Sequence, residues 1–79
     1  MMQFKQYDVV KIIEINKKFD EDDLKYNIRL PKVGDIAYII EIYTHPHLGY
    51  ELECSDKDGI TQWLMAFSPK EIKLELITE

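Results

Sequence analysis

The sequence predicts a small all-β fold of five antiparallel strands, and two observations carry this prediction. Apolar residues recur at every second position over residues 36–43, 50–54 and 60–67. Turn-forming residues interrupt these runs at short intervals, a pattern typical of antiparallel sheets rather than of helices. The 79 residues suffice for one domain, residues 1–79, and a hydrophobic content of 46% can supply its single core.

The first strand is predicted over residues 7–15, which are rich in β-branched side chains. Apolar residues occupy both faces of this strand, which favours a position inside a curled sheet rather than at its edge. The alternation then stops, and residues 16–33 predict a long first loop. Carboxylates at residues 20–23 could cap a short helical turn within this loop, just before Leu24.

Residues 33–35 predict a turn that leads into the second strand, residues 36–43. Pro46 and Gly49 then predict a connecting loop, because neither residue suits the middle of a sheet. The third strand, residues 50–54, has the cleanest alternation. One of its faces should therefore be buried, and the other, which is acidic, should be solvated.

Residues 55–59 have the composition of a tight hairpin turn, with a glycine where a positive φ closes such loops. The fourth strand follows over residues 60–67, and since both of its faces carry apolar residues, the sequence leaves open which one is buried. Ser68 and Glu71 have the spacing of a capping box, in which the Ser68 side chain accepts a hydrogen bond from the Glu71 N–H. This predicts a single helical or 3₁₀ turn, after which residues 72–76 alternate as the last strand.

A five-strand order with a long first loop, a tight hairpin between strands three and four and a short turn before strand five is that of a small SH3-like barrel. Short motifs also resemble those of a bacterial family of short, uncharacterised SH3-like domains: YDVV at 7–10, KVGDI at 32–36, YELE at 50–53, DG at 58–59 and SP at 68–69. One position departs from the family pattern, since the second glycine of its G-D-x-G motif is Ala37 here. Some members of the family lie beside toxin-like genes, and small acidic immunity proteins are similar in size and charge. The resemblance therefore implies a toxin-neutralising role.

The charge balance disfavours nucleic acid as a partner. Fifteen acidic residues against ten basic ones give a formal net charge of -5, whereas binding to phosphates draws on positive charge. We therefore expect a basic or neutral protein partner. No apolar run reaches the roughly 18 residues of a membrane span, so no membrane association is expected. A single cysteine and the lack of a signal-peptide pattern predict a cytoplasmic protein.

No residue pattern in the chain points firmly to catalysis, to a metal or to a cofactor. His45 and His47 could ligate a metal together with Glu51 or Glu53, but two histidines without a firm third ligand favour a solvent-exposed loop. Cys54 and a histidine could form a nucleophile and base pair. Cys54, however, falls on the face expected in the core, where cysteine behaves as a small hydrophobic residue. We expect a non-enzymatic protein with no metal and no cofactor.

The candidate binding residues are acidic, with one aromatic anchor. Carboxylates of the long loop could steer a basic partner by long-range attraction, while two glutamates and a tryptophan could dock it. The tryptophan has this role if the fourth strand buries Leu64 and turns Trp63 outward. The predicted partner-binding residues are Asp20, Glu21, Asp22, Asp23, Glu51, Glu53 and Trp63.

These features favour an immunity protein or antitoxin that neutralises a cognate toxin. An acidic inhibitor of this kind would mask the basic active surface of a toxin such as a nuclease, with carboxylates where phosphates bind. The alternative is a KOW-type small barrel that binds RNA or a ribonucleoprotein. Its candidate contacts are basic residues of the first half of the chain, which are interleaved with acids: Lys11, Lys17, Lys18, Lys25, Arg29 and Lys32.

Overall fold

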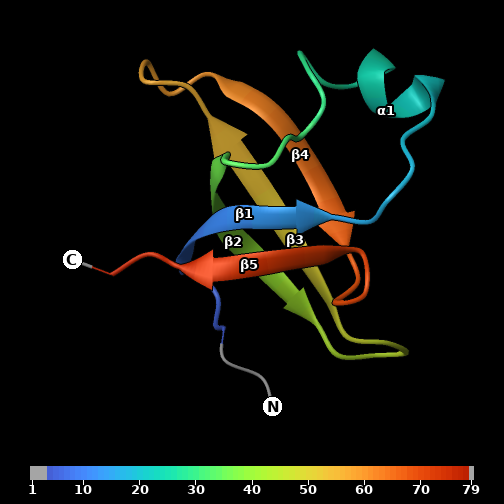
Figure 1. Cartoon of the computed structure of the whole chain (residues 1–79), viewed down its shortest axis with the longest axis vertical. Helices are drawn as coiled ribbons and strands as arrows, with labels where there is room; N and C mark the ends of the chain where they lie inside the picture. Colours follow the sequence, from blue (N-terminus) through green and yellow to red (C-terminus); the bar gives the residue numbers. More distant parts are fainter. Residues whose placement is uncertain (1–3, 79) are drawn as a thin grey trace.

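The computed structural model describes residues 4–78, and its five antiparallel strands form one sheet (Figure 1). In chain order the elements are β1 (Val9–Ile15), α1 (Glu21–Lys25), β2 (Ile36–Tyr43), β3 (Gly49–Ser55), β4 (Thr61–Phe67) and β5 (Ile72–Leu76). The strand order across the sheet is β4-β3-β2-β1-β5, so β1 lies inside the sheet, as its two apolar faces indicate. The predicted all-β class is confirmed. The described residues contain no helix long and apolar enough to cross a lipid bilayer.

The sheet is curled, so that β1 and β5 pass in front of β2, β3 and β4 in Figure 1. Register shifts interrupt the ladders of β1 with β5, of β2 with β3, and of β3 with β4. Each irregularity of this kind bends and twists a strand locally. The crossing strands enclose one core, to which all five contribute: Val10, Ile12, Ala37, Ile39, Tyr50, Leu52, Cys54, Trp63, Met65, Phe67 and Ile72.

The structure also shows which face of β4 is buried. Trp63 and Phe67 are at most 1% exposed, and their rings meet edge to face with 6.1 Å between the ring centres. Leu64 lies on the opposite face and is 45% exposed. Aromatic side chains bury more apolar area than leucine or alanine. This orientation therefore places the two largest fully buried side chains in the core.

The small SH3-like barrel expected from the sequence is not confirmed, because the hydrogen-bonded sheet is not closed and ends at β4 on one side and at β5 on the other. Near this opening, Asn16 donates its N–H to the Glu71 carbonyl, and Lys17 Nζ donates to the Ala66 carbonyl at 3.0 Å. The chain that leaves β1 thus bonds the start of β5 and the end of β4. β5 has five residues and pairs with β1, and no described ladder joins it to β4.

The hairpin turn before β4 has the predicted chemistry, whereas the turn before β5 differs. Gly59 adopts a φ of +83° and donates its N–H to the Asp56 carbonyl at 3.0 Å. Before β5, the Ser68 carbonyl, and not its hydroxyl, accepts the Glu71 N–H at 3.0 Å, while the Glu71 carboxylate accepts the Ser68 N–H at 2.9 Å. This backbone bond joins residues three apart, so residues 68–71 form the single 3₁₀-type turn expected there, and β5 begins at the next residue.

The long loop covers the outer edge of β4. Ile28 and Arg29 donate their N–H groups to the Gln62 carbonyl at 2.9 and 3.3 Å. Leu64 donates its own N–H to Oδ1 of Asn27 at 2.9 Å. Backbone groups at the edge of a sheet are otherwise open to pairing with another chain. The loop therefore occupies this edge with residues of the same chain.

Candidate functional site

Large apolar side chains are exposed together where the long loop meets β4. Tyr26 and Ile28 of the loop are 77% and 62% exposed, and with the half-exposed Leu64 of β4 they line an open hollow of about 470 Å³. Tyr38 of β2 is 52% exposed. In the register of the sheet, Glu53 of β3 stands between Tyr38 and Leu64. These five residues are named the outer patch.

The outer patch lies beside α1, and Asn27 connects the two. Its Oδ1 accepts the N–H of Leu64 at 2.9 Å, and its Nδ2 donates to the carbonyl of Asp23 in α1 at 2.6 Å. Leu64 in turn is the ladder partner of Glu53. The carboxylates predicted for steering and those predicted for docking therefore belong to neighbouring parts of one surface.

Glutamates on the outer face of the sheet adjoin the outer patch. Glu41 and Glu51 are direct partners in the ladder of β2 with β3, and like charges placed opposite each other destabilise a sheet. Neutral groups bind the carboxylates: the Tyr43 hydroxyl donates to Glu51 at 2.7 Å, and Thr61 Oγ1 donates to Glu53 at 2.6 Å. The first of these bonds raises the pKa of Tyr43. Within residues 4–78 no ion pair neutralises the three glutamates, so their charge faces solvent or a partner.

Two of the four carboxylates at α1 are used by the helix itself. Asp20 is the N-cap, and its Oδ1 accepts the Asp23 N–H at 3.0 Å, while the Asp23 carboxylate accepts the Asp20 N–H at 2.8 Å. This reciprocal pair satisfies two backbone donors at the helix start. Glu21 and Asp22 are exposed and have no part in the cap. They are the α1 carboxylates available to a partner.

Trp63 does not reach the surface, so it cannot be the docking anchor that an outward orientation would have made it. Its side chain is 0% exposed, and Nε1 donates to Oδ2 of Asp35 at 2.9 Å. A buried indole N–H needs a hydrogen-bond acceptor, and Asp35 provides one from the turn before β2. The exposed aromatic residues of the site are instead Tyr26 and Tyr38, which alternation alone does not distinguish from core residues.

Asp35 is a buried polar centre that no sequence pattern singles out. Two guanidinium nitrogens of Arg29 donate to its two carboxylate oxygens, each at 2.9 Å, and the Lys32 N–H donates at 3.0 Å. Burial by itself raises the pKa of Asp35, but the Arg29, Lys32 and Trp63 hydrogen bonds together outweigh it, so the pKa lies below its usual value. The network fastens the long loop, including Ile28 of the outer patch, to the core.

Stability is expected to fall in acid through Asp35. Because its pKa is lower in the folded than in the unfolded chain, the unfolded chain binds the proton more tightly. The stabilisation is therefore complete above the unfolded carboxyl pKa of about 3.9, and it is lost as the pH falls through the folded value. In urea unfolding, Asp35→Asn should be less stable than wild type at neutral pH, and the two unfolding midpoints should converge in acid. A gap of constant size at every pH would contradict this expectation.

The structure does not bring Cys54 to the histidines. His45 and His47 lie in the exposed loop before β3, and Cys54 lies near the far end of that strand, about 16 Å along an extended chain. Cys54 is 4% exposed, and its burial, with a smaller effect of the Asp35 charge, raises the pKa of the thiol. Within the described part of the chain, no three His, Cys, Asp or Glu residues are grouped so that they could hold a metal ion.

Two of the basic residues considered for RNA binding are engaged within the fold. Arg29 bonds Asp35 through both ends of its guanidinium group. Lys17 Nζ bonds the Ala66 carbonyl and lies 5.3 Å from the centre of the Phe67 ring. These contacts reduce the positive surface that phosphate binding would draw on.

The outer patch and the glutamates beside it form the candidate functional site. Exposed aromatic and aliphatic side chains supply the core of many protein interfaces, and charged residues around them set specificity. Comparison of the chain with models of known protein families, with curated proteins and with solved structures found no match.

Proposed function

We propose that this chain is a non-enzymatic protein-binding module whose partner docks on the outer patch. The observation that carries the proposal is the exposure of Tyr26, Ile28, Tyr38 and Leu64 beside glutamates that have no ion pair within residues 4–78. Apolar side chains of this size give an interface its dry contact area. The neighbouring carboxylates favour a positively charged partner surface and a high association rate.

The partner in this proposal is a cognate toxin, and the chain is its immunity protein or antitoxin. A nuclease binds phosphates with a basic cleft, and the carboxylates of Glu41, Glu51 and Glu53 could occupy such a cleft in their place. The net charge of -5 supports an inhibitor of this kind. The resemblance to short SH3-like bacterial domains adds support, and the strand order β5-β1-β2-β3-β4 is compatible with an SH3-like module.

The direct test uses the product of the neighbouring gene in the native genome. If the proposal holds, that product is a toxin, and co-expression with this chain yields a stable complex and protects the cell. For a nuclease toxin, the purified chain should abolish nucleic-acid cleavage. A neighbouring translation operon, together with tight binding of the purified chain to RNA at physiological salt, would contradict the proposal and favour the KOW-type alternative.

Removal of the free charges at α1 is expected to slow association with a basic partner. The variant Glu21→Gln/Asp22→Asn keeps the Asp20–Asp23 cap, so its folding should be unchanged. With the neighbouring toxin, or with a synthetic peptide of alternating lysine and leucine, the association rate constant should fall roughly threefold to tenfold at low salt. The difference should vanish at high salt, where the Debye length is only about 3 Å.

The matched control for this variant is Asp58→Lys, which changes the net charge by the same two units at an exposed turn residue whose carboxylate has no ion pair within residues 4–78. Stopped-flow measurements should find little change in its association rate. Equal slowing by this control and by the α1 variant would mean that net charge alone acts. In that case α1 would have no part in steering.

A further inference from the structure

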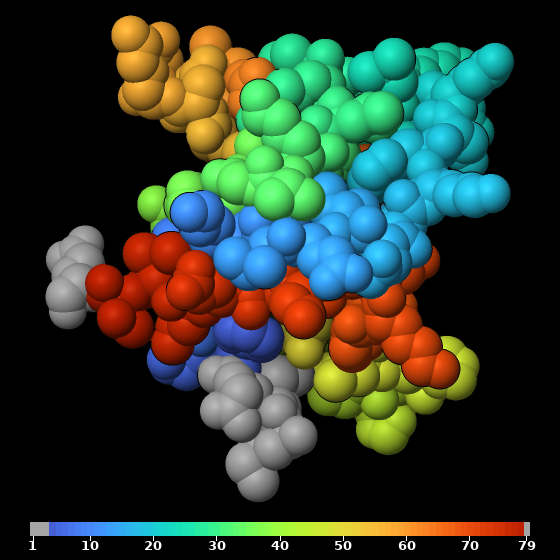
Figure 2. All heavy atoms as spheres, viewed as in Figure 1, coloured from blue at the N-terminus to red at the C-terminus, as the bar shows by residue number. Residues whose placement is uncertain are grey.

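The two edges of the sheet differ in what covers them. Residues of the long loop bond the outer edge of β4, as described above. β5 ends the sheet on the other side, and no described strand pairs with its outer edge. In Figure 2, β1 (blue) and β5 (red) form much of the surface that faces the viewer. β5 is therefore the edge of the sheet that is open to another strand.

Within residues 4–78, no other strand pairs with the backbone groups that β5 directs toward its outer edge. Ile77 donates its N–H to the Val9 carbonyl, and Asn16 donates its N–H to the Glu71 carbonyl. Residues of an antiparallel ladder alternate between facing their partner strand and facing away from it. Glu71 and Ile77 both bond toward β1, so the backbone N–H and C=O groups of residues 73 and 75, which lie between them at steps of two, also face β1. Those of residues 72, 74 and 76 face the open edge.

The charges of β5 are complementary to a second copy of the same strand. In an antiparallel pair centred on Leu74, Lys73 of each copy stands opposite Glu75 of the other, and residues 72 and 76 face each other. If the two-fold axis of the pair passed through residue 73 or 75 instead, lysine would face lysine or glutamate would face glutamate, which is unfavourable. Charged residues commonly protect edge strands from pairing, whereas here they favour one register of self-pairing.

The neighbouring strand β1 extends this charge pattern. Glu14 is the ladder partner of Lys73, with 3.9 Å between the charged atoms, and Lys11 is the ladder partner of Glu75. In the dimer, four side chains would therefore stand in one row across four strands: Glu14, Lys73, then Glu75 and Lys11 of the second copy. Negative and positive charges alternate along this row. Opposite charges on directly facing residues stabilise a sheet.

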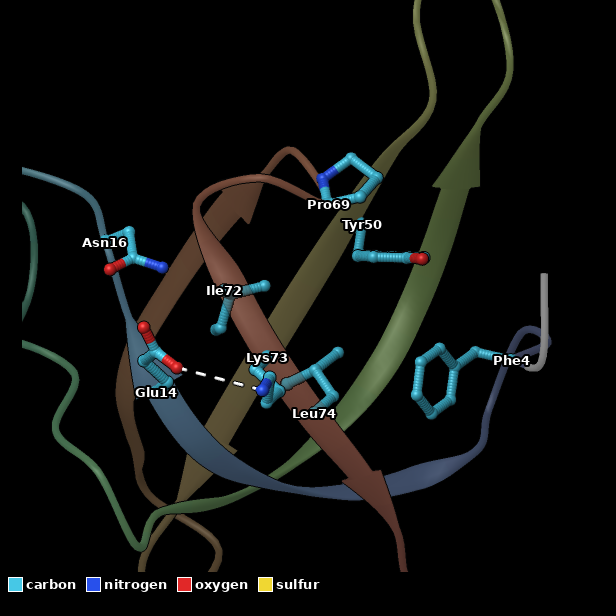
Figure 3. Close-up of a pocket in the computed structure, with 8 residues that line it drawn as sticks. All are labelled: Phe4, Glu14, Asn16, Tyr50, Pro69, Ile72, Lys73 and Leu74. Carbon is cyan, nitrogen blue, oxygen red and sulfur yellow. Dashed lines mark ion pairs between the residues drawn. The ribbon is translucent and has the colours of Figure 1, made fainter. Parts of the chain in front are cut away.

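The apolar face of β5 borders a groove that could receive the second copy. Ile72 and Leu74, with Tyr50, Pro69 and Phe4, line a groove of about 470 Å³ (Figure 3). In Figure 3, Leu74 lies on β5 across from Phe4, and Tyr50 lies between Pro69 and Phe4. Side chains that face each other in an antiparallel pair point to the same face of the sheet. Leu74 of a second copy would therefore enter the apolar side of this groove.

We infer that β5 pairs antiparallel with β5 of a second copy, centred on Leu74, and forms a two-fold dimer with one continuous sheet. The contact is isologous, so each Lys73–Glu75 pair occurs twice. About six backbone hydrogen bonds would form between the strands. The inference does not depend on the proposed function, because β5 lies at the opposite edge of the sheet from β4 and the outer patch.

The test measures the mass of the protein by sedimentation velocity from about 1 µM to about 1 mM, since a contact of this size is weak. The wild type should shift from monomer to dimer over this range. Lys73→Glu and Glu75→Lys should each remain monomeric, because each places like charges opposite each other. A mixture of these two variants should dimerise, because glutamates at 73 and 75 then face lysines at 73 and 75.

Matched controls carry the same charge changes outside β5. Lys70→Glu and Asp58→Lys lie in exposed turns and should dimerise as the wild type does. Thermal unfolding of every variant at low concentration checks that each is folded. A wild-type protein that stays monomeric at about 1 mM would overturn the inference. A dimer that survives both single β5 variants, or a mixture that stays monomeric, would overturn it as well.

Discussion

Asp35→Ala is expected to lower the free energy of unfolding by about 3–5 kcal/mol, a large part of the roughly 5–15 kcal/mol that native proteins have. The Asp35 side chain is 5% exposed and accepts from both ends of the Arg29 guanidinium. Its removal leaves the Trp63 N–H without its acceptor in the core, which costs about 1–3 kcal/mol by itself. The Arg29 side chain is 34% exposed, so water can partly compensate its charge.

Urea unfolding followed by circular dichroism measures this loss. Asp58→Ala is the control, since Asp58 is exposed in the turn before β4, and its effect should stay within about 0.5 kcal/mol. Hydrogen exchange should also rise at the N–H groups of Ile28 and Arg29, because Asp35 holds that segment through Arg29. An Asp35→Ala protein as stable as the Asp58→Ala protein would show that the buried carboxylate does not stabilise the fold.

The strands were predictable because their signals are local. β2 and β5 begin and end where alternation predicts, at Ile36–Tyr43 and Ile72–Leu76. Glu51 and Glu53 alternate with buried residues, so their outward orientation followed from the period of two. The cap of α1 was also local, since a run of carboxylates before a helical turn supplies both partners of the Asp20–Asp23 pair.

The orientation of β4 could not be predicted, because both of its faces are apolar. Local propensity does not distinguish a strand that buries Trp63 from one that buries Leu64. Burial of Trp63 also needs an acceptor for its indole N–H, and Asp35, far away in the sequence, provides it. The pairing of Asp35 with Arg29 could not be predicted either, because both residues lie in an irregular segment where no periodicity indicates the direction of a side chain.

The outer patch was only half predictable for the same reason. Its glutamate, Glu53, lies on a strand with clean alternation. Tyr26 and Ile28 come from the long loop, and they join Leu64 only because Asn27 and the Gln62 carbonyl bind the loop to the edge of β4. Closure of the barrel likewise depends on contacts between distant segments. The sequence predicted the strands in their order but not the opening between β4 and β5.

Trp63→Ala is expected to lower the free energy of unfolding by about 3–5 kcal/mol, because it leaves a cavity at a fully buried site. Trp63 packs edge to face against Phe67 and donates to Asp35. Trp63→Phe separates these two contributions, since it retains an aromatic ring but removes the donor. Both variants lose the hydrogen bond to Asp35, so Trp63→Phe should lower the free energy of unfolding by less than Trp63→Ala does. The difference between them measures the ring packing that phenylalanine retains.

Leu64→Ala is the matched control for Trp63→Ala, because the two residues are neighbours on β4 with opposite faces. Leu64 is 45% exposed, so its truncation should cost no more than about 1 kcal/mol. Circular dichroism in urea suits all three variants, since it does not require the tryptophan. A larger loss for Leu64→Ala than for Trp63→Ala would mean that β4 presents its other face to the core. Trp63 would then be exposed, and it would again be a candidate docking residue for the partner.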